Sequence, residues 1–266
     1  MNIFLRELKA NRKALIIWSV CMFLLIASGM AKYTAYSAGS GQSINDLLAT
    51  IPSSIKGLLG FGSFDMTTAS GFFAMLFLYI ELTVAIHAAL LGAGIIAKEE
   101  CDKTTEFLMI KPVSRATIIT SKLTAALINI IVINIVSLVS SIAMVAAYNK
   151  GADISGKIAM FILSMFIVQL IFLSLGAALA AFMKNPKSSG SLATGILLVA
   201  YFVSRITDMS DRLNILNLIS PFKYFSIINL EAGKGLNIGI VLLSLALVAI
   251  FSVSTYIFYK KRDLKV

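Results

Sequence analysis

One histidine and two cysteines are all that the sequence offers for zinc or disulfide chemistry. A single histidine, His87, excludes the H-E-x-x-H zinc motif, and no G-x-S-x-G nucleophile turn occurs. Cys21 falls inside the first long apolar run and Cys101 in a polar loop, so the two are expected at different depths relative to a membrane. Without a C-x-x-C spacing, neither a disulfide framework nor a metal site is supported. The sequence therefore lacks the zinc and serine-nucleophile motifs on which many hydrolases depend.

Charged residues are also scarce, at 14% of the 266 residues, whereas 58% are hydrophobic and the mean hydropathy is +0.90. A helix needs about 20 mostly apolar residues to cross roughly 30 Å of hydrocarbon. Six runs meet or approach this length: 14–30, 72–97, 123–148, 158–183, 188–204 and 236–259. The alternation typical of membrane β-strands is absent, so continuous runs predict helices. We expect an all-α membrane protein in which residues 1–266 form a single transmembrane domain.

Lysine and arginine are unevenly distributed among the segments that join these runs. If the six spans alternate in direction, fifteen of the 23 lie on one side and eight on the other. By the positive-inside rule, the richer side, which holds both termini, is cytoplasmic. The net charge of +10 is split among four separate loops and tails, so it reports topology and indicates no nucleic-acid binding.

Residues 3–13 alternate apolar and basic side chains at helical spacing. This pattern predicts a short amphipathic helix that lies on the inner leaflet before the first span. A simple cluster of positive-inside charges is the alternative explanation of the same residues.

Two glycine-containing segments resemble nucleotide-binding motifs without meeting their requirements. GADISGKI, at 151–158, approaches a P-loop, but Ile158 replaces the hydroxyl residue that would hold Mg²⁺ and no strand precedes the segment. GAGIIA, at 92–97, matches a dinucleotide pattern but lies inside the second span, where small residues allow close helix packing. We therefore predict that this chain binds no nucleotide or other cofactor.

The segment from residue 98 to 122 interrupts the apolar runs with charged, proline-containing sequence. Thr104 or Thr105 can cap a new helix, and Glu106 in its first turn favours the positive end of the helix dipole. Pro112 lacks an N–H group and disfavours helix in the residue before it, so this helix must stop near residue 111. The pattern predicts a short helix parallel to the membrane, and an ordinary solvated loop is the alternative.

The predicted loop helix carries an apolar face made by Phe107, Leu108 and Ile110. An apolar face in a cytoplasmic loop favours contact with a partner protein. Ser114 can then cap the next helix, which we expect to continue through Arg115 into the third span.

The sequence KTTEFLMIKPVSRATIITSK, at 103–122, resembles the stretch after the second span of ABC-2-type transporter permeases. The recurring Thr-x-Glu-x-Leu-x-x-x-Pro-x-Ser-Arg pattern is matched by Thr104, Glu106, Leu108, Pro112, Ser114 and Arg115. ISPFKY before the last span, YKKRDL near the C-terminus and six spans in the same order agree with this resemblance. Lys103 departs from it, because relatives often have glycine before the threonine, and this puts the turn geometry there in question.

The resemblance implies a permease half that dimerises with a second copy of itself and sits on two copies of a separate ATPase, which holds ATP and Mg²⁺. It also implies a multi-pass protein of the bacterial plasma membrane. The loop helix would be the coupling helix that docks on the ATPase, and the N-terminal amphipathic helix would be a second contact surface. The residues expected at this interface are Lys98, Glu99, Glu100, Thr104, Thr105, Glu106, Phe107, Leu108, Ile110, Pro112, Ser114 and Arg115.

Polar residues inside the predicted spans are candidates for lining a transport pathway: Glu81, His87, Asn129, Asn134 and Gln169. An ionised carboxylate at mid-bilayer costs about 2.5–3.5 kcal/mol on insertion scales, so Glu81 should face protein or water. Its side chain and that of His87 should lie about 120° apart around the helix. We expect Glu81 to line the dimer interface or the cargo route, and hydrogen bonds between helices to account for the others.

The sequence thus predicts the transmembrane subunit of an ATP-driven exporter whose cargo is an antimicrobial or toxin peptide or a small hydrophobic compound. Two alternatives are left open. A secondary transporter would use Glu81 as a proton site and would work without an ATPase. A non-transporting membrane assembly or sensor subunit would bind an ATPase without cargo-stimulated turnover.

Overall fold

The computed structural model describes residues 3–38, 50, 52, 64–104, 113–149, 151, 153–207 and 217–261. Six helices in this part are long and apolar enough to cross a membrane: α1 (Ile3–Ala38), α4 (Ala69–Cys101), α6 (Arg115–Tyr148), α7 (Ser155–Phe182), α8 (Ser189–Thr207) and α10 (Ile238–Lys261). Short helices join some of them: η1 (Pro186–Ser188), η3 (Pro221–Lys223) and α9 (Ile227–Glu231). The prediction of an all-α chain with six membrane-length helices is confirmed for these residues.

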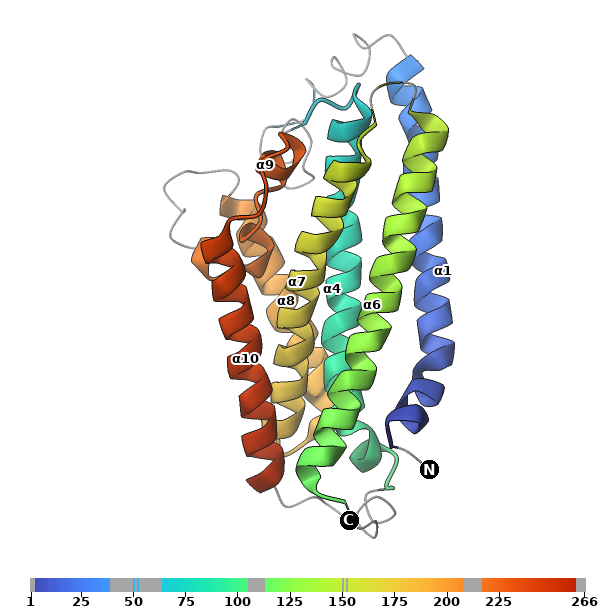
Figure 1. Cartoon of the computed structure of the whole chain (residues 1–266). Coiled ribbons are helices and arrows are strands. Elements are labelled where there is room, and N and C mark those ends of the chain that lie inside the picture. Colours follow the sequence, from blue (N-terminus) through green and yellow to red (C-terminus); the bar gives the residue numbers. More distant parts are fainter. Residues whose placement is uncertain are drawn as a thin grey trace.

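Helix α4 occupies the centre of the bundle, in contact with α1, α6, α7 and α8 (Figure 1). Helix α1 packs along α6 on one side, and α10 packs along α7 on the other. In the most apolar parts of α4 and α7, 67% of the residues are buried, against 17% in α1 and 11% in α10. The apolar faces of α1 and α10 are therefore left to lipid or to another membrane protein.

The two ends of the described chain lie at the same end of the bundle, which we term the base; the opposite end is the top (Figure 1). At the base, α1, α6 and α8 begin and α4, α7 and α10 end. Tyr33 near the end of α1 donates to the Thr67 carbonyl beside the start of α4 at the top, at 3.2 Å. The described residues on either side of 105–112 are thus at the base, together with both ends of the described chain.

Helix α1 runs without interruption from Ile3 to Ala38, so the prediction of a separate amphipathic helix at 3–13 is wrong. The segment contains no proline or glycine that would break the helix. Its first turns are also held against α4, because Arg6 lies 2.6 Å from Glu99. The charged residues before the first apolar run therefore extend the spanning helix.

Helices α4 and α7 approach each other closely at two glycines. A Cβ atom at Gly92 would lie 2.0 Å from the Leu173 carbonyl oxygen, and one at Gly176 would lie 2.3 Å from the Ala89 carbonyl oxygen. Only glycine fits at either position without moving a backbone. The prediction that Gly92 serves helix packing is confirmed, whereas a Cβ at Gly94 would meet nothing within 4 Å.

Two apolar clusters fill the interior. The larger one includes Phe73, Phe77 and Phe161, whose rings contact one another with the Phe77 and Phe161 centroids 4.8 Å apart. The smaller one, toward the base, is rich in alanine, including Ala93 and Ala177. Small side chains bring α4, α6 and α7 close together there, and the charged residues of the base lie at the end of this cluster.

Candidate coupling site at the base of the bundle

Helix α4 ends directly before the predicted coupling loop in a turn that satisfies its last carbonyl groups. The Asp102 N–H donates to the Lys98 carbonyl and the Thr104 N–H to the Glu99 carbonyl, both at 2.8 Å. Between them, Lys103 has a φ of 56°. This is a Schellman motif, whose left-handed residue is usually glycine. The turn that glycine would favour is therefore formed by Lys103, at a conformational cost of about 1–2 kcal/mol.

Helix α6 begins on the other side of the loop with the cap that the sequence predicts. The Ser114 hydroxyl accepts a hydrogen bond from the Thr117 N–H at 3.1 Å. The Arg115 guanidinium donates to the carbonyl oxygens of Tyr259 at 3.3 Å and Lys260 at 3.1 Å, at the end of α10. A cation at this place complements the negative end of the α10 dipole. The start of α6 is thereby tied to the last helix.

Two oppositely charged side chains, one from each side of the loop, pair inside the bundle. Lys122 of α6 is fully buried, and its ammonium lies 2.5 Å from Oε2 of Glu99, which is buried at the end of α4. The same ammonium donates to the backbone carbonyl of Ile95. A buried ion pair needs such additional hydrogen bonds to offset the desolvation of both charges. Glu99 and Lys122 therefore join the end of α4 to the start of α6 immediately behind the loop.

The first turns of α1 complete this arrangement. Arg6 places Nη2 2.6 Å from Oε1 of Glu99 and 2.8 Å from Oε1 of Glu7. Glu7 is fully buried, and its second oxygen lies 3.7 Å from the Lys98 ammonium. We term these five residues (Arg6, Glu7, Lys98, Glu99 and Lys122) the base network. Its three cations and two carboxylates join α1, α4 and α6.

The structure thus brings part of the predicted interface together at the base. Lys98 and Glu99 belong to the base network, Thr104 to the turn after α4, and Ser114 and Arg115 to the start of α6. Glu100 is half-buried in the last turn of α4. The following predicted residues lie outside the described part of the chain: Thr105, Glu106, Phe107, Leu108, Ile110 and Pro112. The coupling helix itself stays a prediction.

Three members of the base network were not among the predicted site residues: Arg6, Glu7 and Lys122. One signal was available, because Glu7 is the only acidic residue before Asp46 and stands in a basic segment. A carboxylate in that position indicates a specific cationic partner. Lys122 gives a weaker signal, since a lysine beside an apolar run is usually assigned to the membrane surface.

Glu81 of α4 is buried, so the prediction that it faces protein and not lipid is confirmed. It lies within the electrostatic range of Arg205, a buried residue of α8. The Arg205 guanidinium also lies 5.5 Å from the centre of the Tyr201 ring. The sequence placed Arg205 beyond the fifth span because the apolar run ends at 204, whereas α8 continues to Thr207.

His87 faces another neighbour of α4. Its ring centroid lies 5.0 Å from that of Trp18 on α1, whereas Glu81 is near α8. The structure therefore does not bring Glu81 and His87 together, in agreement with their expected separation around the helix.

The remaining polar candidates form hydrogen bonds within α6 and between α6 and α7. Asn134 of α6 donates to the side-chain oxygen of Gln169 on α7 and to the Ile130 carbonyl of its own helix, the latter at 2.8 Å. Asn129 donates to the Ala125 carbonyl at 2.7 Å. The expected bond between helices is confirmed for Asn134 and Gln169, whereas the bond from Asn129 to the Ala125 carbonyl stays within α6.

Among the described residues, no group of three or more His, Cys, Asp or Glu side chains could hold a metal ion. Both cysteines are free: Cys21 is exposed on α1 and Cys101 is half-buried at the end of α4.

Comparison with known proteins addresses the chain as a whole. A model of the ABC-2 family transporter proteins matches residues 1–264, and no curated protein matches the chain. Transmembrane subunits of ABC-2 permeases lack ATPase activity and generally pair with ABC ATPase subunits. With its six membrane-length helices and a family match over nearly its whole length, the chain belongs to the ABC-2 family of transporter proteins, as a multi-pass membrane component.

Proposed function

We propose that this chain is the permease subunit of an ATP-driven exporter, working as a homodimer on two copies of a separate ABC ATPase. In this proposal the base faces the cytoplasm of a bacterium, since the segments expected there carry most of the lysine and arginine. Residues 98–122 receive the ATPase, with the apolar side chains at 107, 108 and 110 as the docking face. The cargo is a peptide or a small hydrophobic compound.

The observation that carries this proposal is the base network. Glu99 is followed by the loop and Lys122 comes after it, and their side chains are 2.5 Å apart. Both flanks of the loop are therefore held to each other and, through Arg6, to α1. A force applied to the loop would reach α1, α4 and α6 together, because the ion pairs resist separation of the helix ends.

This arrangement supports a rocking mechanism. Closure of the two ATPases on ATP would displace the loop, and the helices joined by the base network would move as one body. Arg115 would carry part of the displacement to the end of α10 through its bonds to the Tyr259 and Lys260 carbonyls. Movement of these helices against the second protomer would open and close a path along the two-fold axis.

The decisive experiment uses the permease and its ATPase reconstituted together in vesicles. Phe107→Ala and Glu106→Gln should reduce cargo-stimulated ATP turnover to the unstimulated rate, because the docking face is weakened while the protein remains inserted. Val113→Ala serves as the matched control, since Val113 is exposed at the end of the same loop. Wild-type coupling in the Phe107 and Glu106 variants would refute the docking role of the loop.

A secondary transporter that uses Glu81 as a proton site is the first rival. The buried carboxylate favours it, whereas the nearby positive charge of Arg205 favours a structural role for Glu81. The rival predicts cargo uptake into vesicles driven by a pH gradient without ATPase or ATP. We expect no uptake under these conditions.

A non-transporting assembly or sensor subunit is the second rival. It predicts that the ATPase binds to the base and that candidate cargoes leave ATP turnover unchanged. A panel of peptides and hydrophobic compounds, tested on the reconstituted pair, distinguishes it from an exporter because only an exporter accumulates cargo across the membrane.

A further inference from the structure

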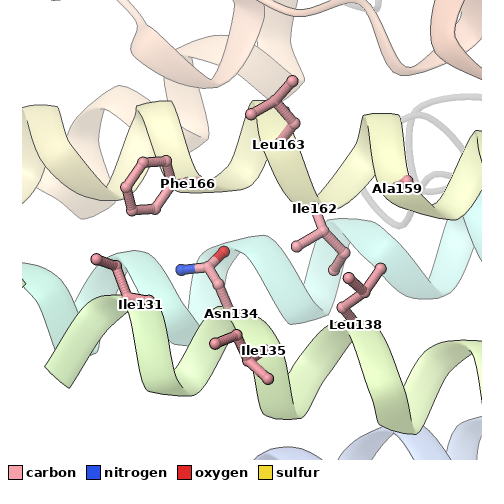
Figure 2. A pocket seen from close by; sticks show the side chains of 8 residues that line it. All are labelled: Ile131, Asn134, Ile135, Leu138, Ala159, Ile162, Leu163 and Phe166. Carbon is pink, nitrogen blue, oxygen red and sulfur yellow. The ribbon is translucent and has the colours of Figure 1, made fainter. Parts of the chain in front are cut away.

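Two features of the bundle outside the base have no part in the proposed function. One is a groove of about 330 Å³ between α6 and α7, lined by apolar side chains apart from Asn134 (Figure 2). Its walls are two long helices, so helix packing fixes its shape. The other is the segment from residue 217 to 237, which joins α8 to α10 and contacts α4, α7 and α8. Because the helices of this segment are short, it can change shape without moving the spanning helices.

The first half of this segment is held in place by buried contacts, and we term residues 220–225 the anchor. Phe222 is only 2% exposed, and its ring centroid lies 5.2 Å from that of Phe172 on α7 and 5.4 Å from that of Tyr201 on α8. The fully buried Ser220 hydroxyl donates to a backbone carbonyl of α8 at 2.7 Å. The anchor therefore cannot leave the bundle without exposing aromatic rings.

Helix α9 forms the second half, and it is held differently. Ile227 and Leu230 are buried on its inner side, where α9 contacts α4 and α7. Its outer tie is the ammonium of Lys157, at the start of α7, which lies 3.8 Å from the Glu231 carboxylate and 3.2 Å from the Ser70 hydroxyl of α4. The two charged side chains are about one-third exposed, so water screens the pair and makes it weak.

Both ends of α9 carry residues that suit a hinge. The Ser226 hydroxyl accepts a hydrogen bond from the Asn229 N–H at 3.3 Å, so the helix begins immediately after the anchor. Gly233 follows the helix with a φ of 77°, and a Cβ at Gly235 would meet nothing within 4 Å. Glycine at these positions allows the large backbone rotations that a moving element needs.

We propose that α9 is a lid on the top of the bundle, which lifts from α4 and α7 when the Lys157–Glu231 pair opens while the anchor stays in place. Lifting uncovers part of the larger apolar cluster, because Ile227 and Leu230 belong to that cluster. The place of the lid in transport rests on the proposed function, in which the top faces away from the cytoplasm. The lid then covers the outer end of each protomer.

The test measures hydrogen exchange of the full chain in phosphatidylcholine nanodiscs by mass spectrometry. The N–H groups of Leu230 and Ala232 in the lid, and of Lys223 and Tyr224 in the anchor, all donate to carbonyl groups of the segment. Their exchange therefore reports opening. The lid amides should be protected about tenfold less than the anchor amides. Glu231→Gln should speed exchange in the lid about threefold and leave the anchor unchanged, because a partly exposed ion pair is lost.

Matched variants separate the ion pair from a general effect of charge. Lys234→Gln removes an exposed cation from the same segment and should exchange like the wild type. Lys157→Glu/Glu231→Lys reverses the pair and should restore wild-type protection of the lid. In a chain with both native cysteines replaced by serine, Lys157→Cys/Glu231→Cys joined by a short bis-maleimide should protect the lid as strongly as the anchor.

Equal protection of lid and anchor in the wild type would overturn the inference, because the segment would then open as one body. So would faster exchange of both halves in Glu231→Gln, or the same effect from Lys234→Gln. The measurement needs no ATPase, so the two proposals fail separately. Uniform exchange with intact ATP coupling refutes only the lid, and independent opening of α9 without ATP coupling refutes only the exporter.

Discussion

Lys122 is fully buried, although lysine is among the residues that are least often without solvent contact. Its ammonium is balanced by Glu99 and bonded to the Ile95 carbonyl. Neither partner is evident from local pattern, because Glu99 precedes Lys122 by 23 residues and the two meet only when α4 and α6 pack. The sequence predicts the position of Lys122 at the start of the third span, but not its burial.

Replacing Lys122 by Met should lower the free energy of unfolding by about 3 kcal/mol, because Glu99 then stays buried with one cation fewer. Thermal unfolding in detergent measures this, with Lys184→Met, an exposed site at the base, as control. Lys122→Met/Glu99→Leu should recover part of the loss, since no uncompensated carboxylate is left. A single variant as stable as Lys184→Met would contradict the structural role of the pair.

Lys103 differs from Lys122, because the sequence itself raises the question of its backbone conformation. The resemblance described above predicts glycine where lysine stands, and the structure has a φ of 56° there. The turn is retained, and lysine bears a strain that glycine would not.

Lys103→Gly should therefore stabilise the protein by about 1 kcal/mol in thermal unfolding. Asp102→Gly is the neighbouring control and should destabilise it, since Asp102 has a φ of −86° in the right-handed region and gains nothing from glycine. Equal effects of the two substitutions would argue against a left-handed turn at Lys103.

At the scale of elements, six helices follow from hydropathy, but their ends do not. The apolar run 14–30 becomes Ile3–Ala38, because Arg6 and Glu7 are kept in the helix by ion pairs with α4. Helix α6 begins where the sequence predicts, since a capping serine after proline is a local signal. Local signals therefore predict element boundaries here, whereas contacts between distant charges extend the elements beyond them.

The α4–α7 contact requires glycine at position 92 but not at position 94. Gly92→Ala should destabilise the bundle by about 2 kcal/mol, because its Cβ collides with the Leu173 carbonyl and forces the helices apart. Gly94→Ala meets open space and should be neutral or stabilising by up to about 1 kcal/mol, as alanine favours helix. Thermal unfolding of both variants checks this pair, and similar unfolding temperatures would contradict the close approach.

At the scale of the whole molecule, the two ends of the bundle differ in their charged residues, and its helices differ in the fraction of residues that is buried. The base holds the buried ion network, whereas the top joins α7 to α9 through Lys157 and Glu231, 3.8 Å apart and partly exposed. The family and the six spans could be predicted from sequence because both rest on local composition and motif. The base network could not, because it depends on how three helices meet.

Cysteine labelling should establish which end faces the cytoplasm. In a variant with Cys21 and Cys101 replaced by Ser, Asn185→Cys places an exposed thiol at the base and Ala232→Cys one at the top. A membrane-impermeant maleimide should label the Ala232 site in intact cells and the Asn185 site only after permeabilisation, since lysine and arginine concentrate on the cytoplasmic side. The reverse pattern would exclude docking of a cytoplasmic ATPase at the base.

The bonds from α6 to α10 also impose an order on how the chain is made. Glu99 and Lys122 leave the ribosome early, so their pair can form once the third spanning helix has been inserted. Arg115 reaches the carbonyls of Tyr259 and Lys260, and the Thr120 hydroxyl lies 2.7 Å from that of Tyr256. These bonds cannot form until residues 256–260 have been translated. A nascent protein that stops short of Tyr256 would have its other spanning helices in the bilayer but would lack the hydrogen bonds that join the start of α6 to the end of α10.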